Sequence, residues 1–247
     1  MEKNLFIKSP YYFYTNLSVT NKIDVLKSFF KLKILIYTFT KCKNQKMENN
    51  MNKKVLVVVD YQKDFASPEG ALYVPQAETI AERIQREINN DMYDAIVYTM
   101  DSHINEDYEN SEEAEMFPPH CEYGTQGWDF FEIEPNNPQL RTVMKNGSCP
   151  KDIRIGNEFV FVKDQFDIWA GNINYENFIR TFDKDTEFTI VGVATNYCVF
   201  SNAMGYKNIG YNNVSVIEDA VKGIQDDSFE TNINTMKENG IAFVGGN

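Results

Sequence analysis

Six short apolar runs, rich in β-branched residues, recur along the chain with helix-like patterns between them. Such runs are typical of βαβ units, because a parallel strand is covered on both faces and therefore carries few polar residues. The pattern predicts an α/β fold: a single domain with a doubly wound, mostly parallel six-stranded sheet and helices on both faces. The expected strands are Val55 to Val59, Ala95 to Thr99, Phe159 to Val162, Phe188 to Val193, Val214 to Ile217 and Ile241 to Val244.

The predicted domain covers residues 51–247, about 197 residues, enough for one such domain with a full core. Residues 1–50 differ, with nine lysines, three acidic residues and no glycine, while the whole chain has a formal net charge of −12. Their longest apolar run, Ile34 to Phe39, is too short to span a bilayer, and no signal-peptide pattern is present. We expect a basic N-terminal extension that is disordered or reflects a non-native start.

Polar residues follow four of the predicted strands. Asp60 follows the first run, Asp101 and His103 the second, Lys163 the third, and Cys198 lies just beyond the fourth. In an open α/β sheet, ligands bind outside the carboxyl ends of the strands. These side chains are therefore candidates for one site.

An aspartate, a lysine and a cysteine at one sheet edge can form a nucleophilic set. The thiolate is the nucleophile, and residues 197–204 look like a helix start, where unpaired N–H groups favour an anion. Asp60 could accept the thiol proton of Cys198, while Lys163 holds the carboxylate and adds positive charge. Taken singly, a buried apolar cysteine or a capping aspartate is the simpler interpretation. The combination favours a catalytic role.

The two histidines of the chain lie in one stretch of twenty residues, as Asp101-Ser102-His103 and Phe117-Pro118-Pro119-His120. A carboxylate and two imidazoles supply the donors that Zn²⁺, Fe²⁺ or Mn²⁺ accept. Two surface histidines are the competing interpretation. The acidic residues that could complete the shell are Glu106, Asp107, Glu109, Glu112, Glu113 and Glu115.

These motifs carry a family resemblance. Residues 57–65 (VVVDYQKDF) resemble the opening motif of the isochorismatase-like cysteine hydrolases, and residues 191–199 (VGVATNYCV) resemble their nucleophile motif. The D-x-H and F-P-P-H elements are similar to those of the metal-binding branch, the nicotinamidases or pyrazinamidases. The resemblance runs from about Met51 to the C-terminus, with four motifs in the expected order.

The resemblance implies a mechanism. Cys198 would attack the carboxamide carbon of nicotinamide, and Asp60 would pass the thiol proton to the departing ammonia. Lys163 would support both residues. The resulting thioester would then hydrolyse to nicotinate. Backbone N–H groups of Ala194 and Cys198 would form the oxyanion hole. A cis peptide between Val193 and Ala194 is also implied.

The resemblance further implies one divalent transition metal ion, with Zn²⁺ preferred over Fe²⁺ or Mn²⁺. It would bind the pyridine nitrogen, held by Asp101, His103 and His120. Glu113 is favoured over Glu112 as a further ligand, because the rigid prolines before His120 fix the spacing between the glutamate and this histidine.

Four aromatic residues match positions that give the family its pocket walls, and ordinary core packing is the alternative for each: Phe65, Phe117, Phe166 and Trp169. Two departures bear on substrate preference. Asn196 stands where the family more often has aspartate, and residues 164–169 read DQFDIW where many members carry a Tyr-Ser-Ala-Phe-like sequence.

The net charge and the cysteines of the chain predict the partners and the compartment of such an enzyme. The acidic balance beyond residue 50 argues against nucleic acid, and nothing in it indicates a membrane partner. The irregular spacing of Cys42, Cys121, Cys149 and Cys198 indicates reduced thiols in a cytoplasmic protein, with Cys121 a bystander to the metal. Family members often form dimers or tetramers, so a homo-oligomer is compatible with the resemblance.

Two further functions stay open at this point, and a third is disfavoured. The chain could be a related hydrolase of another small amide or of isochorismate, branches that generally lack the histidine pair. It could be a non-catalytic binding module of the same fold. A non-haem iron oxygenase is disfavoured, because its facial triad usually reads H-x-D on a β-barrel.

Overall fold

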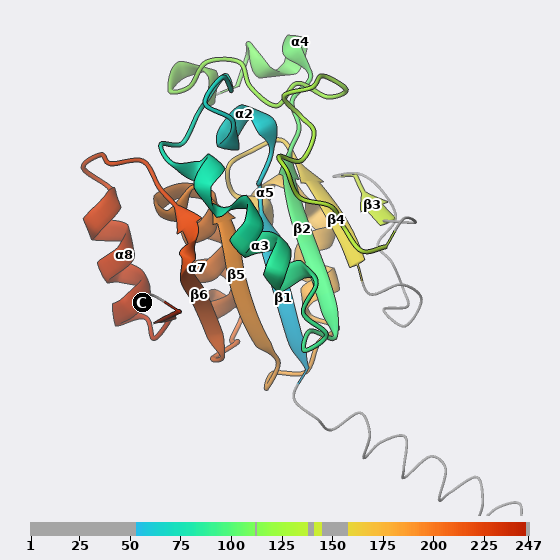
Figure 1. Ribbon diagram of the computed structural model, residues 1–247, viewed down its shortest axis with the longest axis vertical. Helices are drawn as coiled ribbons and strands as arrows, with labels where there is room; N and C mark the ends of the chain where they lie inside the picture. The colour runs from blue at the N-terminus through green and yellow to red at the C-terminus, as the bar shows by residue number, and fades with distance from the viewer. Residues whose placement is uncertain (1–52, 112, 138–140, 145–157, 246–247) are drawn as a thin grey trace, which may run out of the picture. The chain divides into compact units, whose positions relative to one another are not determined.

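The computed structural model describes residues 53–111, 113–137, 141–144 and 158–245 (Figure 1). Its strands are β1 (Lys54–Val59), β2 (Ala95–Asp101), β3 (Arg141–Val143), β4 (Glu158–Lys163), β5 (Glu187–Val193), β6 (Val214–Lys222) and β7 (Ala242–Val244). Its α-helices are α2 (Lys63–Ala66), α3 (Ala81–Ile88), α4 (Asn105–Tyr108), α5 (Ile168–Gly171), α6 (Ile173–Ile179), α7 (Phe200–Asn208) and α8 (Phe229–Glu238). Two 3₁₀ turns, η2 (Ala77–Ile80) and η3 (Glu113–Glu115), and one π-helical turn, η4 (Thr195–Val199), complete the described elements.

The strands form one parallel sheet in the order β3-β4-β2-β1-β5-β6-β7. The predicted α/β fold is confirmed, and all six predicted strands are present. Within the described residues the sheet has a seventh strand, β3, which the sequence analysis missed. Its three residues, Arg-Thr-Val, are too few to give a recognisable apolar run.

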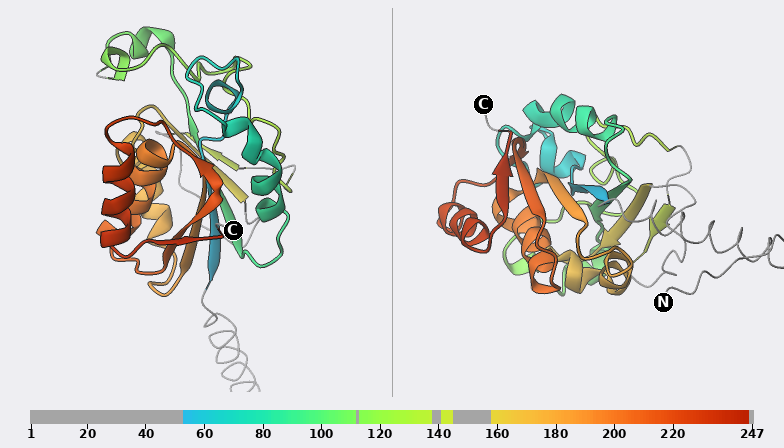
Figure 2. Two further views of the ribbon diagram at one scale, coloured as in Figure 1. Left: turned by 60° about the vertical axis from the view of Figure 1, so that its left-hand side comes forward. Right: turned by 90° about the horizontal axis from the view of Figure 1, so that it is seen from below.

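The sheet is covered on both faces, as Figure 2 shows, with α3 on one side and α6, α7 and α8 on the other. Alternate residues of β1 face two separate cores, because successive side chains of a strand point to opposite faces. Val55, Val57 and Val59 belong to the cluster that contains residues of α6 and α7. Leu56 and Val58 belong to the cluster that contains residues of α3. A strand buried in this way must be apolar throughout, which explains the continuous runs in the sequence.

The carboxyl ends of β4, β2, β1 and β5 lie side by side, because these four strands are consecutive neighbours in the sheet. The register places Asp101 beside Lys163 and Val59 beside Gly192. After β1 the chain builds β2, β3 and β4 on one side and then β5, β6 and β7 on the other. The strand order therefore reverses at β1, the position at which open α/β sheets bind ligands.

The predicted extension, residues 1–50, lies outside the described residues, as do Cys42 and Cys149. Cys121 and Cys198 are both buried free thiols. Within the described ranges, no helix has the length and apolar character needed to span a membrane.

Gly192 lets β5 run close beside β1. Its φ is +113°, and a Cβ at this position would overlap the carbonyl oxygen of Val59. We expect Gly192→Ala to lower the free energy of unfolding by about 3 kcal/mol or more, because both the backbone conformation and the close approach exclude a methyl group. Urea denaturation measures this loss.

Gly124→Ala is the matched control for that measurement. Gly124 has a φ of +82°, but nothing lies within 4 Å of a Cβ built there. Its substitution should therefore cost only about 1 kcal/mol, from backbone conformation alone. Equal losses for the two variants would contradict the role assigned to the contact with β1.

Candidate active site

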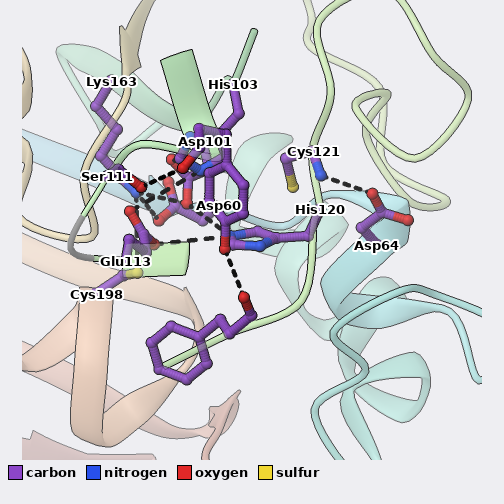
Figure 3. A network of polar contacts seen from close by, with 12 residues as sticks. Asp60, Asp64, Asp101, His103, Ser111, Glu113, His120, Cys121, Lys163 and Cys198 are labelled. Atoms are coloured by element: carbon purple, nitrogen blue, oxygen red, sulfur yellow. Dashed lines mark hydrogen bonds and ion pairs between the residues drawn. The ribbon is translucent and has the colours of Figure 1, made fainter. Parts of the chain in front are cut away.

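The structure brings the three predicted catalytic side chains together at the switch point of the sheet (Figure 3). Asp60 directly follows β1, Lys163 ends β4, and Cys198 lies in η4. The Lys163 Nζ lies 2.9 Å from Asp60 Oδ2 and 3.9 Å from Cys198 Sγ. All three residues are buried, so the thiol, the carboxylate and the ammonium interact with little screening by water.

The Asp60 carboxylate is held from two sides. Thr99 Oγ1 donates a hydrogen bond of 2.7 Å to Asp60 Oδ1, while Lys163 binds the other oxygen. The backbone N–H of Asp60 donates to the carbonyl oxygen of Thr99, and Asp60 adopts a left-handed φ of 45°. The sequence analysis treated Thr99 only as a strand residue. A threonine hydroxyl at the end of the second apolar run, two residues before Asp101, was the available signal.

Burial raises the pKa of the Cys198 thiol well above its ordinary value, and the opposing effect of the Lys163 ammonium does not overcome this. The resting thiol is therefore protonated, and attack on a substrate requires a base to remove the proton. Burial by itself would lower the pKa of Lys163, but Asp101 and Asp60 raise it well above its ordinary range. Lys163 thus remains an ammonium.

The nucleophile sits in a helical segment that begins with η4 and continues directly into α7. The predicted helix start near Cys198 is present, although it begins earlier, at Thr195, and its first turn is π-helical. The predicted cis peptide between Val193 and Ala194 is also present. The Ala194 carbonyl oxygen accepts hydrogen bonds from the N–H groups of Tyr197 (3.0 Å) and Val199 (3.2 Å).

A second cluster adjoins the first and consists of Asp101, His103, Glu113 and His120. Each residue offers one ligand atom, and these atoms lie within 4.8 Å of one another. His103 Nε2 is 3.2 Å from Asp101 Oδ1, and His120 Nε2 is 3.4 Å from Asp101 Oδ2. The Glu113 oxygens lie 4.0 Å and 3.7 Å from the same two nitrogens. Two carboxylates and two imidazoles converging in this way form a candidate divalent metal site.

Three atoms in this cluster indicate that the residues fit a cation. Asp101 Oδ1, His103 Nε2 and Glu113 Oε2 are buried and make no hydrogen bond with the rest of the described chain. An unsatisfied buried polar atom is costly, and a divalent ion would satisfy all three. The His120 Nδ1 lies 2.8 Å from the Pro118 carbonyl oxygen, an arrangement that presents Nε2 to the cluster.

The opposite pKa shifts of the two carboxyl groups also fit a cation site. Burial would raise the pKa of Asp101, but Lys163, His103 and His120 lower it well below its ordinary value. Burial and the neighbouring charge of Asp101 raise the pKa of Glu113. A cation between the two carboxyl groups would relieve this repulsion.

Of the acidic residues considered from the sequence, Glu113 is the one that the described part of the chain places in the cluster. Glu112 and the Glu106 side chain lie outside the described residues. The side chains of Asp107, Glu109 and Glu115 are exposed.

Two residues of the first motif hold this cluster in place, and the sequence analysis did not single them out. Gln62 Oε1 accepts a hydrogen bond of 2.7 Å from the N–H of Asp101, and its Nε2 donates to the Asp101 carbonyl oxygen at 2.9 Å. Asp64 Oδ2 accepts a hydrogen bond of 2.6 Å from the N–H of Cys121, next to His120. The first strand exit therefore positions candidate metal ligands from two other segments.

A cavity lies over Cys198 and is bordered by Asp101, Glu113 and His120. Its walls are mainly apolar, a surface suited to a small flat ligand. Phe65, Phe117 and Phe166 line it. Four further lining residues had not been singled out: Leu72, Val74, Tyr197 and Ile224.

Trp169 is not among the described residues that line this cavity. Its ring packs edge-on against Tyr175 and Tyr206, with centroid distances of 4.9 and 5.1 Å. Its Nε1 donates to the Asn202 carbonyl oxygen. The short helix α5 directs Trp169 toward α7 and the core.

Comparisons with known proteins give consistent results. Residues 54–245 match the model of the isochorismatase domain. A nicotinamidase from Saccharomyces cerevisiae is 28% identical over 219 residues, which covers 75% of this chain and 94% of that protein. The residues matched by the domain model, 54–245, agree with the stretch from about Met51 to the C-terminus that carries the resemblance in the sequence.

Two solved structures have a similar fold. The pyrazinamidase of Pyrococcus horikoshii in complex with zinc has a TM-score of 0.60 at 26% identity, covering 78% of this chain and 99% of that one. The structure of PnC1 from L. infantum in complex with nicotinate has a TM-score of 0.61 at 21% identity, covering 78% of this chain and 92% of that one. At this identity, the second comparison supports the fold alone.

We expect the protein to bind one Zn²⁺ ion per chain and His120→Ala to weaken that binding by at least about a hundredfold, because one of four converging donors is lost. Competition with a chromophoric chelator measures the affinity. Glu109→Gln is the control, because this carboxylate belongs to the same segment but is exposed. Unchanged affinity of the His120→Ala variant would refute the assigned site.

Proposed function

Because this chain belongs to the isochorismatase domain family, we propose that it is a metal-assisted amidohydrolase that converts nicotinamide to nicotinate and ammonia. The observation that carries the proposal is the position of Lys163 between the two clusters. Its Nζ lies 2.9 Å from Asp60 Oδ2 in the nucleophilic set and 3.3 Å from Asp101 Oδ2 in the metal cluster. A substrate in the cavity would therefore meet the thiol and the candidate metal site together.

The reaction begins with proton transfer from Cys198 to Asp60, which the buried, protonated thiol requires. The sulfur attacks the carboxamide carbon, and the carbonyl becomes a tetrahedral oxyanion. The N–H groups of Ala194 and Cys198 are the proposed donors to this oxygen. Asp60 returns the proton to the departing nitrogen, ammonia leaves, and a thioester remains.

Water completes the cycle. Asp60 accepts a proton from the water molecule as its oxygen attacks the thioester carbon. The carbon–sulfur bond breaks, nicotinate leaves, and the proton returns to the sulfur of Cys198. Lys163 keeps the Asp60 carboxyl group oriented through both halves of the reaction, because both residues are buried and Lys163 Nζ lies 2.9 Å from Asp60 Oδ2.

The walls of the cavity favour a flat aromatic amide. Phe65, Phe117 and Tyr197 border it, and the Phe117 and Tyr197 rings meet edge to face with centroids 5.7 Å apart. When bound by Asp101, His103, Glu113 and His120, a divalent ion, for which we propose Zn²⁺, would supply a Lewis acid for the pyridine nitrogen and so orient the ring. Pyrazinamide offers the same ring nitrogen and amide.

The similarity to a nicotinamidase and to a zinc-bound pyrazinamidase supports this choice of substrate and ion. We place the reaction in the cytoplasm, as a step of NAD salvage.

The direct test uses the purified, zinc-loaded protein with nicotinamide. We expect stoichiometric release of ammonia and nicotinate, measured by a coupled ammonia assay and by chromatography. Isochorismate and an aliphatic amide serve as comparison substrates, because they lack the ring nitrogen. Absence of product from a sample with confirmed metal content would overturn the proposed substrate.

Cys198→Ala should reduce turnover by at least about a thousandfold, because no thioester can form without the sulfur. Zinc affinity should stay unchanged, since Cys198 is not part of the metal cluster. Cys121→Ala is the matched control, because this thiol is also buried but does not line the cavity. Retained turnover in Cys198→Ala would exclude the covalent mechanism.

A further inference from the structure

The connection between β6 and α8 holds the nucleophile turn through Asn196. This residue is 1% exposed, and its amide group is fully used. Its Nδ2 donates to Asp226 Oδ1 at 3.1 Å and to Ser228 Oγ at 2.8 Å. Its Oδ1 accepts from the N–H of Ile224 at 3.0 Å. The arrangement requires an amide, because a carboxylate could not donate to Asp226.

The next residue, Tyr197, is bound to the same carboxylate. Its hydroxyl donates to Asp226 Oδ2 at 2.6 Å, while the side chain lines the cavity and its ring contacts Phe117. Asp226 thus binds two consecutive side chains immediately before Cys198, one through each oxygen. Asp226 does not itself line the cavity.

Asp226 is exposed, yet it is well suited to this contact. Its Oδ1 also accepts from the N–H and the hydroxyl of Ser228, at 2.9 and 2.6 Å. Slight desolvation would raise the pKa of Asp226, but the hydrogen bonds from Ser228, Tyr197 and Asn196 lower it below its ordinary value. Charge-assisted hydrogen bonds of this kind are stronger than neutral ones.

Gly223 allows the connection to approach the turn. A Cβ at this position would lie 2.8 Å from Asn196 Oδ1 and 3.0 Å from the Thr195 Cβ. On the other side of the turn, Asn232 of α8 donates to the Asn196 carbonyl oxygen at 2.8 Å. The turn that carries Cys198 is therefore held by contacts with residues that are far away in the sequence.

We propose that Asp226 is a positioning residue that sets both the orientation of the nucleophile turn, through Asn196, and the substrate-facing wall, through Tyr197. The assignment to substrate binding rests on the proposed amide hydrolysis. The two contacts have separable effects. Loss of the Tyr197 contact loosens a wall and weakens substrate binding, whereas loss of the Asn196 contact shifts the sulfur and slows the chemical step.

The wall contact is tested with Tyr197→Phe, which keeps the ring and removes the hydroxyl. We expect the KM for nicotinamide to rise by about tenfold, with kcat and the alkylation rate of Cys198 within about threefold of wild type. Asp226→Ala should show the rise in KM together with a fall in kcat.

Asp227→Ala is the control, because Asp227 is an exposed neighbour whose carboxylate makes no hydrogen bond or ion pair in the described part of the chain. Equal kinetic constants for Asp226→Ala and Asp227→Ala would overturn the proposal.

The turn contact is tested by exchanging donor and acceptor. Asn196→Asp places two carboxylates against each other and should lower kcat by about tenfold or more. The double variant Asn196→Asp/Asp226→Asn restores one amide donor and one carboxylate acceptor but leaves the Ser228 N–H without its acceptor, Asp226 Oδ1, and we expect it to raise kcat at least about threefold above that of Asn196→Asp. Failure of the double variant to recover, with a melting temperature equal to that of wild type, would refute the pairing.

Alkylation of Cys198 by iodoacetamide, followed by mass spectrometry of the Cys198 peptide, provides a readout independent of the substrate. We expect Asn196→Asp to change this rate by at least about threefold, and the double variant to shift it back toward the wild-type value. A wild-type protein that does not hydrolyse nicotinamide would overturn the proposed function alone. Identical alkylation rates in wild type and Asn196→Asp would overturn the positioning role alone.

Discussion

The buried ion pairs of Lys163 are the interaction on which the rest of the site depends. One ammonium contacts Asp60 of the proposed nucleophilic set and Asp101 of the candidate metal site, and it lies 3.9 Å from the sulfur of Cys198. A buried charge without a partner is strongly destabilising, so these groups can be buried only as a set. The same contact that makes the arrangement stable also brings the nucleophile beside the candidate cation site.

The topology of the sheet supplies this arrangement. Lys163 and Asp101 are register partners at the ends of β4 and β2, and Asp60 follows the adjacent strand. Polar side chains from the interior and from loops then complete it, as Thr99 orients Asp60 and Gln62 binds the backbone of Asp101. The functional groups come from distant parts of the sequence, but their positions are determined by strand order and by a few buried hydrogen bonds.

Strands buried on both faces have to be apolar throughout, so they and the polar residues at their ends could be predicted from the sequence. The short strand β3 lacks this signal. Side-chain direction is harder to predict: Trp169 packs toward the core, whereas Tyr197 lines the cavity, and no local pattern distinguishes them. The contacts of Asp226 join segments about thirty residues apart, and such pairings become visible only when the chain is folded.

The left-handed backbone of Asp60 has an evolutionary consequence. Few residue types other than glycine, asparagine and aspartate adopt a positive φ at low cost. The replacements that this position tolerates most easily, asparagine and glycine, keep the conformation but remove the carboxylate. Either replacement also takes one of its two buried carboxylate partners from Lys163, so a lineage that loses the reaction at this site is expected to replace Lys163 as well.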